Sequence, residues 1–227
     1  QHDRHTASLY TMDAQTGHLL KHISIPRLQS CGTFNLITVQ DEIAYISGTE
    51  RGSHNPHCLC LAIDLQTGAH KWTADLGECI GTTTPVVANA HIYLVTLALQ
   101  RGHLHALDAQ TGKTIWTHTF ERHQAQEITV IGTDIFIAGA MLEIIDATTG
   151  TKRWSFADPQ RILNGPPMVN NERICMSYED SPSHTSQSEK REKSEIILSG
   201  EPSHGSGMMA VDQASMQLQW IVPLPQW

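Results

Sequence analysis

The chain has 227 residues, 40% hydrophobic and 17% charged, which is ordinary for a globular protein and long enough for a large core. Its formal net charge of −8, with no cluster of Lys or Arg, argues against a nucleic-acid-binding surface. No apolar run reaches the roughly 18 residues of a membrane-spanning helix, so the sequence predicts no transmembrane segment. The five cysteines are an odd number, at spacings that match no disulfide framework.

In chain order the sequence predicts five β-hairpins, because one phrase returns five times. Each copy is an apolar run that ends in Asp, then a Thr-Gly turn, then a second run that ends in Trp. The copies are residues 9–21, 60–72, 104–116, 142–154 and 208–220, and the third reads LHALDAQTGKTIW. Such an internal repeat indicates one supersecondary unit that is copied and stacked.

Each conserved position of the repeat is expected to have a structural role. The Asp carboxylate accepts backbone N–H groups two or three residues on, and Gly takes the positive φ of the turn. The Trp buries on the order of 200 Å2 and is expected to dock one repeat onto the next. A small residue two positions before Asp (Ala62, Ala106, Ala210) leaves room for a neighbouring indole. The repeat positions are Asp13, Gly17, Asp64, Gly68, Trp72, Asp108, Gly112, Trp116, Asp146, Gly150, Trp154, Asp212 and Trp220.

The first and last copies deviate from the repeat, as terminal repeats are expected to. The first has Lys21 in place of Trp, and the last has Met216 in place of Gly.

Upstream of four hairpins lies a second pair of β-rich runs around a polar turn, such as Asn89-Ala90, Thr133-Asp134 or Asn170-Asn171. A full unit is therefore four antiparallel strands in roughly 40–45 residues, which is typical of a β-propeller blade. The predicted fold is all-β, a single propeller domain or a fragment of one over residues 1–227. Its blades are 8–26 (outer hairpin only), 31–77, 78–121, 123–158 and 162–224.

One segment departs from the repeat. Residues 179–206 are rich in Ser, Glu, Lys and Pro, a composition that predicts a flexible insertion between the second and third strands of the last blade. A shorter insertion, residues 48–57, has the same place in the second blade. In a four-stranded meander both loops emerge on the same face as the connections between blades, and we expect binding on that face.

The phrase ALDAQTGKTIW, Ala106 to Trp116, resembles the repeat of the pyrroloquinoline quinone (PQQ) type β-propellers, in which this pattern forms the tryptophan-docking motif between blades. The resemblance covers nearly the whole chain in register. Members usually close rings of about seven or eight blades, whereas about four and a half are found here. We therefore expect a fragment, or further blades from missing sequence or from another chain, which includes self-association.

The resemblance implies two functional alternatives, quinoprotein dehydrogenases that use PQQ and calcium, and non-catalytic scaffolds such as the lipoprotein of the outer-membrane protein assembly machinery. The enzymes use an Asp base, a calcium site of Glu, Asn and Asp, a Trp beneath the quinone and often a disulfide between adjacent cysteines. This sequence has no pair of adjacent cysteines. All its Trp residues except Trp227 belong to the docking motif, and its repeat Asp residues are expected to stabilise the turns. We predict no cofactor and no catalytic residue, with PQQ and calcium as the alternative.

Two further groups carry side chains that bind metals or protons. His54, His57, Cys58 and Cys60 place two imidazoles and two thiols within seven residues, a donor set that suits zinc. The alternative is a pair of buried free cysteines on one strand face, and because the spacing is no known zinc pattern we predict no metal site. The 14 histidines, with His103 and His105 on one strand face, are expected to be surface residues, a catalytic base among them being the alternative.

The sequence thus favours a rigid, non-catalytic platform that binds a protein or peptide through one loop face. The alternative is a fragment of a quinoprotein dehydrogenase or a cofactor-binding sensor. The residues leave the localisation open, and the resemblance favours the periplasm or the cell exterior.

Overall fold

The computed structural model describes residues 7–25, 31–50, 55–121, 127–139, 141–158, 161–170, 173–180, 206–212, 214–215 and 217–223. These residues form 19 β-strands and no helix, which confirms the all-β prediction. A helix able to span a membrane is accordingly absent from this part of the chain. The chain divides into two compact units, Gln1–Arg122 (unit 1) and His123–Trp227 (unit 2), and each is described by itself.

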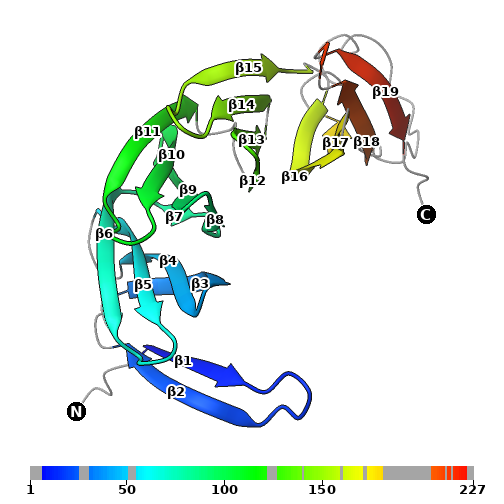
Figure 1. The fold of residues 1–227 in the computed structure, drawn as a ribbon. Helices are drawn as coiled ribbons and strands as arrows, with labels where there is room; N and C mark the ends of the chain where they lie inside the picture. The colour runs from blue at the N-terminus through cyan, green and yellow to red at the C-terminus, as the bar shows by residue number, and fades with distance from the viewer. Residues whose placement is uncertain are drawn as a thin grey trace, which may run out of the picture. The chain divides into compact units, whose positions relative to one another are not determined.

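Unit 1 consists of a hairpin and two larger sheets (Figure 1). The hairpin pairs β1 (Ala7–Met12) with β2 (Leu19–Ile25) in antiparallel register. The second sheet lies between the hairpin and the third sheet in Figure 1. It is a four-stranded antiparallel meander of β3 (Cys31–Gln40), β4 (Ile43–Glu50), β5 (His57–Asp64) and β6 (His70–Glu78).

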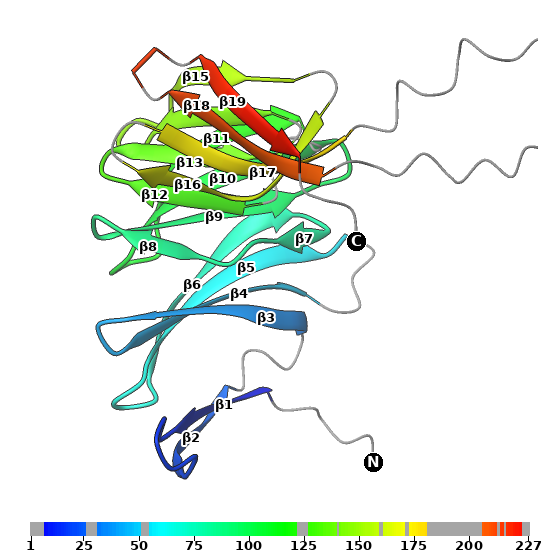
Figure 2. The same cartoon turned by 90° about the vertical axis from the view of Figure 1, so that its right-hand side faces the viewer.

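The third sheet of unit 1 has a divided inner strand. Its other strands are β9 (His91–Leu97), β10 (Arg101–Asp108) and β11 (Thr114–Glu121). β7 (Gly81–Thr82) and β8 (Val86–Ala88) pair separately with the two ends of β9 (Figure 2). Pro85 precedes β8 and has no N–H to donate to the ladder, which accounts for the interruption.

Unit 2 contains two four-stranded antiparallel meanders. The first is formed by β12 (Glu127–Ile131), β13 (Asp134–Ala138), β14 (Leu142–Asp146) and β15 (Lys152–Phe156). The second is formed by β16 (Arg161–Asn170), β17 (Arg173–Asp180), β18 (Ser206–Asp212) and β19 (Leu218–Pro223). Of the predicted insertion 179–206, residues 181–205 lie outside the described residues, and its ends belong to β17 and β18.

The five Asp turns share one hydrogen-bonding pattern. In each, Oδ1 of the repeat Asp accepts the backbone N–H of the residue three positions on, at 2.6 to 2.8 Å. Hydrogen bonds from that residue, through its hydroxyl or its backbone, hold the pKa of all five carboxyls below the usual value. Four turns place Gly at a φ between 70° and 75°. The fifth has Ser215 in place of Thr, and its Asp212 N–H still donates to Gln217 as the other four do to the equivalent carbonyl.

Two of the three predicted inner turns can be compared with the structure, because Asn170 pairs within β16 and Asn171 lies outside the described residues. Asn89 and Ala90 both have positive φ, 52° and 60°, the geometry of a two-residue hairpin turn. The turn predicted at Thr133-Asp134 lies one residue earlier. Gly132 takes a φ of 59°, which glycine adopts without steric cost, and Asp134 already pairs within β13.

The cores of unit 1 lie on both faces of the β3–β6 sheet. On one face Ile23 and Ile25 of the hairpin pack against Ile46, Leu61 and Ile63. The alternate residues of β5 face the third sheet, where the buried cluster is Tyr45, Cys60, Ala62, Trp72, Ala74, Ile92, Leu94, Leu107 and Ala109. Because both faces are covered, the sheets of unit 1 stack face to face, the arrangement expected of propeller blades.

Unit 2 has its own core between its two sheets. Phe136, Leu142 and Ile144 of the first sheet meet Met176 and Tyr178 of the second, and all five are nearly inaccessible to solvent.

Candidate functional site

Trp72 joins the two larger sheets of unit 1. The side chain lies on β6 and is 7% exposed, and its Nε1–H donates to the carbonyl oxygen of Ala109 at 3.1 Å. Its ring also lies against Gly112, where an added Cβ would be 2.5 Å from Cε3. Ala109 and Gly112 belong to the Asp108 turn of the next sheet. Two constraints therefore require glycine at position 112. Its φ of 70° is one that glycine adopts without steric cost, and the absence of a Cβ leaves room for the indole.

Lys21 occupies the Trp position of the leading hairpin and makes an equivalent contact. Its Nζ donates to the carbonyl oxygen of Leu65 at 2.8 Å, and it also contacts the carbonyl of Gln66. Leu65 follows the repeat Asp64 by one residue, as Ala109 follows Asp108 in the contact of Trp72. A long cation thus replaces the indole as the donor to the next turn.

A row of aromatic and small side chains crosses each larger sheet of unit 1. Ala62 is paired with Tyr45 on one side and with Trp72 on the other. Because alanine is small, the rings of Tyr45 and Trp72 approach to 6.0 Å over it. In the third sheet Ala106 separates Tyr93 and Trp116 in the same register, and those rings are also 6.0 Å apart.

The two Trp residues of the repeat in unit 2 keep this register. Trp154 lies opposite Ile144 and stacks on Phe156 at 6.0 Å. Trp220 is half-buried and lies opposite Ala210. Docking of one blade onto the next by Trp116, Trp154 and Trp220 stays a prediction.

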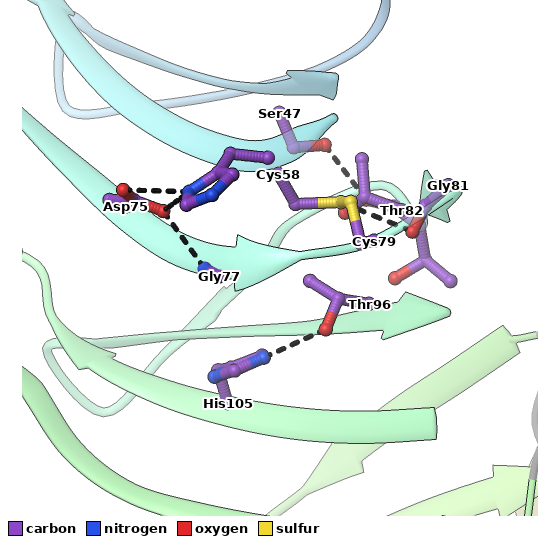
Figure 3. The surroundings of a disulfide bond; sticks show 11 residues. Ser47, Cys58, Asp75, Gly77, Cys79, Gly81, Thr82, Thr96 and His105 are labelled. Carbon is purple, nitrogen blue, oxygen red and sulfur yellow. Dashed lines mark hydrogen bonds and ion pairs between the residues drawn. A yellow bond between two sulfur atoms is a disulfide. The ribbon is translucent and has the colours of Figure 1, made fainter. Parts of the chain in front are cut away.

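A disulfide lies at the end of the unit 1 sheets away from the Asp turns (Figure 3). Cys58, near the start of β5, is bonded to Cys79, directly after β6, with their Cα atoms 5.6 Å apart. The interpretation of Cys58 and Cys60 as two buried free cysteines is therefore wrong for Cys58. The antiparallel pair places His57 opposite Glu78, which brings the two cysteines together across the ends of neighbouring strands.

Of the four residues weighed as zinc ligands, the three that the structure describes do not share a site. The disulfide removes the Cys58 thiol, and His54 lies outside the described residues. Cys60 is fully buried, and burial raises its pKa to about 12, so the thiol stays protonated. His57 Nδ1 lies 2.9 Å from the Asp75 carboxylate. In the described part of the chain no three His, Cys, Asp or Glu side chains are grouped to hold a metal.

Asp75 sits beside the disulfide, where Figure 3 shows its carboxylate next to Gly77. Burial raises the pKa of Asp75, but the Gly77 N–H at 2.9 Å and the His57 imidazole outweigh that effect and hold it below its usual value. The carboxylate is therefore ionised at neutral pH and fixed in position, and it anchors His57 at the rim of this end.

A hollow of about 430 Å3 opens beside the disulfide. It is lined by the β4–β5 loop at Asn55 and Pro56, the link 78–80, the β9–β10 loop 98–101, and His103. Within these segments Ile80 and Leu99 are exposed apolar side chains, 46% and 74% accessible. Among the lining residues, Asn55 Nδ2 donates to the Glu78 carboxylate at 3.0 Å. The lining of the hollow thus combines apolar and polar side chains, a composition typical of a binding pocket.

His105 corrects the expectation that the histidines are surface residues. It is 7% exposed, and its Nε2 lies 2.9 Å from the Thr96 hydroxyl (Figure 3). Its Nδ1 lies 3.3 Å from the Thr117 hydroxyl. Burial, with a smaller effect of His103, lowers its pKa to about 4. The imidazole is thus neutral and structural, held between two hydroxyls.

The hollow lies at the loop end where the sequence predicts binding, and that prediction stays untested; the residues that line the hollow were not predicted. Cys79, Ile80 and Leu99 follow no motif of their own. Counting outward from the Asp64 turn does not reveal the partner of Cys79, because the register shifts between His57 and Leu59.

Comparisons with known proteins agree on one architecture. A family model of the PQQ-like repeats, described as outer membrane protein assembly factor BamB, matches residues 57–222. No curated protein sequence matches the chain. The crystal structure of BamB from Moraxella catarrhalis superposes with a TM-score of 0.62 at 14% identity, over 98% of this chain and 67% of that one.

Two other solved structures share the fold. The quinohemoprotein alcohol dehydrogenase ADHIIG from Pseudomonas putida HK5 gives a TM-score of 0.59 at 14% identity, over 97% of this chain and 40% of that one. The Dos1 propeller gives 0.61 at 10% identity, over 96% of this chain and 55% of that one. Identities this low show the fold alone, which is that of a β-propeller, and this chain spans only part of each relative's length.

Proposed function

The chain belongs to the PQQ-like β-propeller family of the outer membrane protein assembly factor BamB, and we propose that it is a non-catalytic platform that binds a protein partner. The binding face is the end of the sheets that carries the β4–β5 and β9–β10 loops. The observation that carries this proposal is the hollow beside the Cys58–Cys79 disulfide, whose lining includes the exposed apolar side chains of Ile80 and Leu99 together with polar residues.

The chemistry of this hollow suits a protein ligand. Exposed aliphatic side chains supply burial energy, and the surrounding amide, carboxylate and guanidinium groups supply orientation. Backbone hydrogen bonds hold the segments that line the hollow in place. Cys79 N–H donates to the Pro56 carbonyl at 2.9 Å and Ile80 N–H to the Leu97 carbonyl at 2.7 Å, so the link between the sheets is bonded to both. A pre-organised surface loses less entropy on binding.

The same family relationship leads us to propose tryptophan docking as the contact that holds the blades together, with Trp72 as the representative case. The repeat carboxylates accept backbone hydrogen bonds in their own turns. This arrangement supports a packing role for the repeat over a cofactor-binding role, and we propose that the chain binds neither PQQ nor calcium.

We further propose an extracytoplasmic location, periplasmic in a bacterium with two membranes. The Cys58–Cys79 disulfide supports it, because such bonds form and persist in oxidising compartments. The description of the matching family as an outer membrane protein assembly factor is consistent with the same compartment.

The platform proposal is tested by site-specific photo-crosslinking in the source organism. A photoreactive residue replaces Leu99 at the hollow, or Leu20, which is 66% exposed in the leading hairpin, as the matched control. We expect one defined protein adduct at position 99, absent at position 20 and lost when Ile80→Asp is added. Identical adducts at both positions, or none at position 99, would contradict the proposal.

The cofactor proposal is tested by titrating the purified chain with PQQ and Ca2+ while following tryptophan fluorescence. We expect no saturable quenching. Saturable micromolar binding that requires calcium would instead favour a fragment of a quinoprotein dehydrogenase or a cofactor-binding sensor.

A further inference from the structure

The hollow of unit 1 has three walls, and the disulfide joins two of them. The first wall is Asn55 and Pro56 at the end of the β4–β5 loop, the second is the link 78–80, and the third is the β9–β10 loop 98–101. Cys58 follows the first wall directly along β5, and Cys79 lies within the second. The covalent bond therefore fixes these two walls to each other.

The strands that carry the first two walls are poorly paired at this point. His57 of β5 pairs with Glu78 of β6, but the only β5 residue opposite the two β6 residues 76–77 is Cys58. Such a bulge disrupts the ladder locally. The last pair of the ladder, at the edge of the hollow, is thus separated from the regular part of the sheet.

Two hydrogen bonds cross between the first and second walls beside the disulfide. Asn55 Nδ2 donates to the Glu78 carboxylate at 3.0 Å, and the Cys79 N–H donates to the Pro56 carbonyl at 2.9 Å. Each hydrogen bond exchanges with bonds to water, so its net contribution is modest. The disulfide is therefore expected to supply most of the attachment between these walls.

The second and third walls are joined in a different way. The Ile80 N–H donates to the Leu97 carbonyl at 2.7 Å, and the third wall closes on itself where the Ala98 N–H donates to the Arg101 carbonyl at 2.8 Å. Neither contact involves the β4–β5 loop or the disulfide. Loss of the bridge consequently releases the first wall from the second and leaves the third wall as it is.

The bridge is placed to be opened and closed reversibly. Cys58 is fully buried, whereas Cys79 is 3% exposed and lines the hollow, so a dithiol reductant reaches the bond from the hollow. The dithiol supplies two electrons and two protons and becomes a disulfide, and the S–S bond gives two thiols. Cys60, the free thiol two residues from Cys58, is fully buried with its pKa raised to about 12. It stays protonated and does not compete for the bridge.

We propose that the Cys58–Cys79 disulfide is a redox-sensitive latch of the hollow. In the oxidised chain the first and second walls are held together and the binding surface is complete. In the reduced chain these walls separate and the protein partner is not bound. The latch rests on the platform function proposed above, because it acts on the hollow that binds the partner. In an extracytoplasmic compartment the oxidised, binding-competent state prevails.

The latch itself is tested without the partner, by amide hydrogen exchange of the purified 227-residue chain, resolved by NMR, with and without dithiothreitol. Reduction is expected to speed exchange of the Cys79 amide by roughly 100-fold, the factor that corresponds to loss of a bridge across this loop. The Ala98 amide exchanges as before. The double variant Cys58→Ser, Cys79→Ser shows the fast exchange without reductant, and Cys60→Ala, the matched control, keeps the slow exchange. Circular dichroism confirms that the variants are folded.

The effect on binding is tested by the photo-crosslinked adduct at position 99 in the source organism. We expect the adduct to be lost in the double variant Cys58→Ser, Cys79→Ser and kept in Cys60→Ala. Unchanged exchange of the Cys79 amide on reduction, or an adduct that persists in the double variant, would overturn the latch and leave the platform function standing. An adduct missing even from the chain with an intact bridge would contradict the platform function, and the exchange measurement still decides whether the bridge holds the walls.

Discussion

Replacement of Trp72 tests whether the repeat Trp holds neighbouring blades together. The side chain is 7% exposed and belongs to a cluster drawn from both larger sheets of unit 1. Trp72→Ala removes this packing and is expected to lower the free energy of unfolding by about 3–5 kcal/mol. Trp72→Phe keeps an aromatic ring but leaves the Ala109 carbonyl without its indole donor, a loss of about 1–3 kcal/mol.

The assay is urea denaturation followed by circular dichroism, because the signal then does not depend on the indole that has been removed. Lys21→Met is the matched control. It deletes an equivalent donor to the next turn at a partly exposed position, where such a contact contributes less than about 1 kcal/mol. If Trp72→Ala unfolds within about 0.5 kcal/mol of the wild type, the docking role of the repeat Trp is refuted.

Three further outcomes are expected. The double variant Cys58→Ser, Cys79→Ser loses about 3 kcal/mol, the value for a bridge that spans 21 residues, and dithiothreitol shifts the denaturation midpoint of the wild type but not of this variant. The pKa of His105 falls from 6.5 unfolded to about 4 folded, so below pH 6.5 only the unfolded state gains the proton. Stability therefore drops by about 3 kcal/mol between pH 6.5 and 4, and His105→Gln flattens that dependence in denaturation curves. Gly112→Ala costs about 1–3 kcal/mol more than Gly17→Ala, because both strain a positive φ but only the first meets an indole ring; equal midpoints would contradict the contact.

The repeat determines much of this protein from sequence alone. Asp-x-x-Thr-Gly specifies its turn through contacts within five residues, so local chemistry is sufficient to predict it. Strand alternation then specifies which residues face which side, and the positions of Trp72 and Ala62 follow from the turn by counting. The blade architecture needed no knowledge of any long-range contact, because each blade is a meander of consecutive strands.

The disulfide and the hollow at the proposed binding face could be found only from the tertiary structure. Whether Cys58 meets Cys79 depends on a register shift near the start of β5, where one irregular residue changes the pairing. The number and spacing of the cysteines do not reveal this register. The hollow has the same origin, since Ile80 and Leu99 belong to a link and a loop that come together only when two sheets stack.

The sequence also did not determine which polar side chains are buried. His105 lies on a strand like His103, yet only His105 is enclosed between the hydroxyls of Thr96 and Thr117. Lys21 stands where a Trp was expected, and the structure alone shows that its ammonium group reaches the next turn. Local sequence specifies turns and strand faces because their partners are close along the chain. Packing between sheets determines the shifted pKa values, the disulfide pairing and the pockets. The residues involved are distant in sequence, and their exposure to solvent depends on which segments cover them.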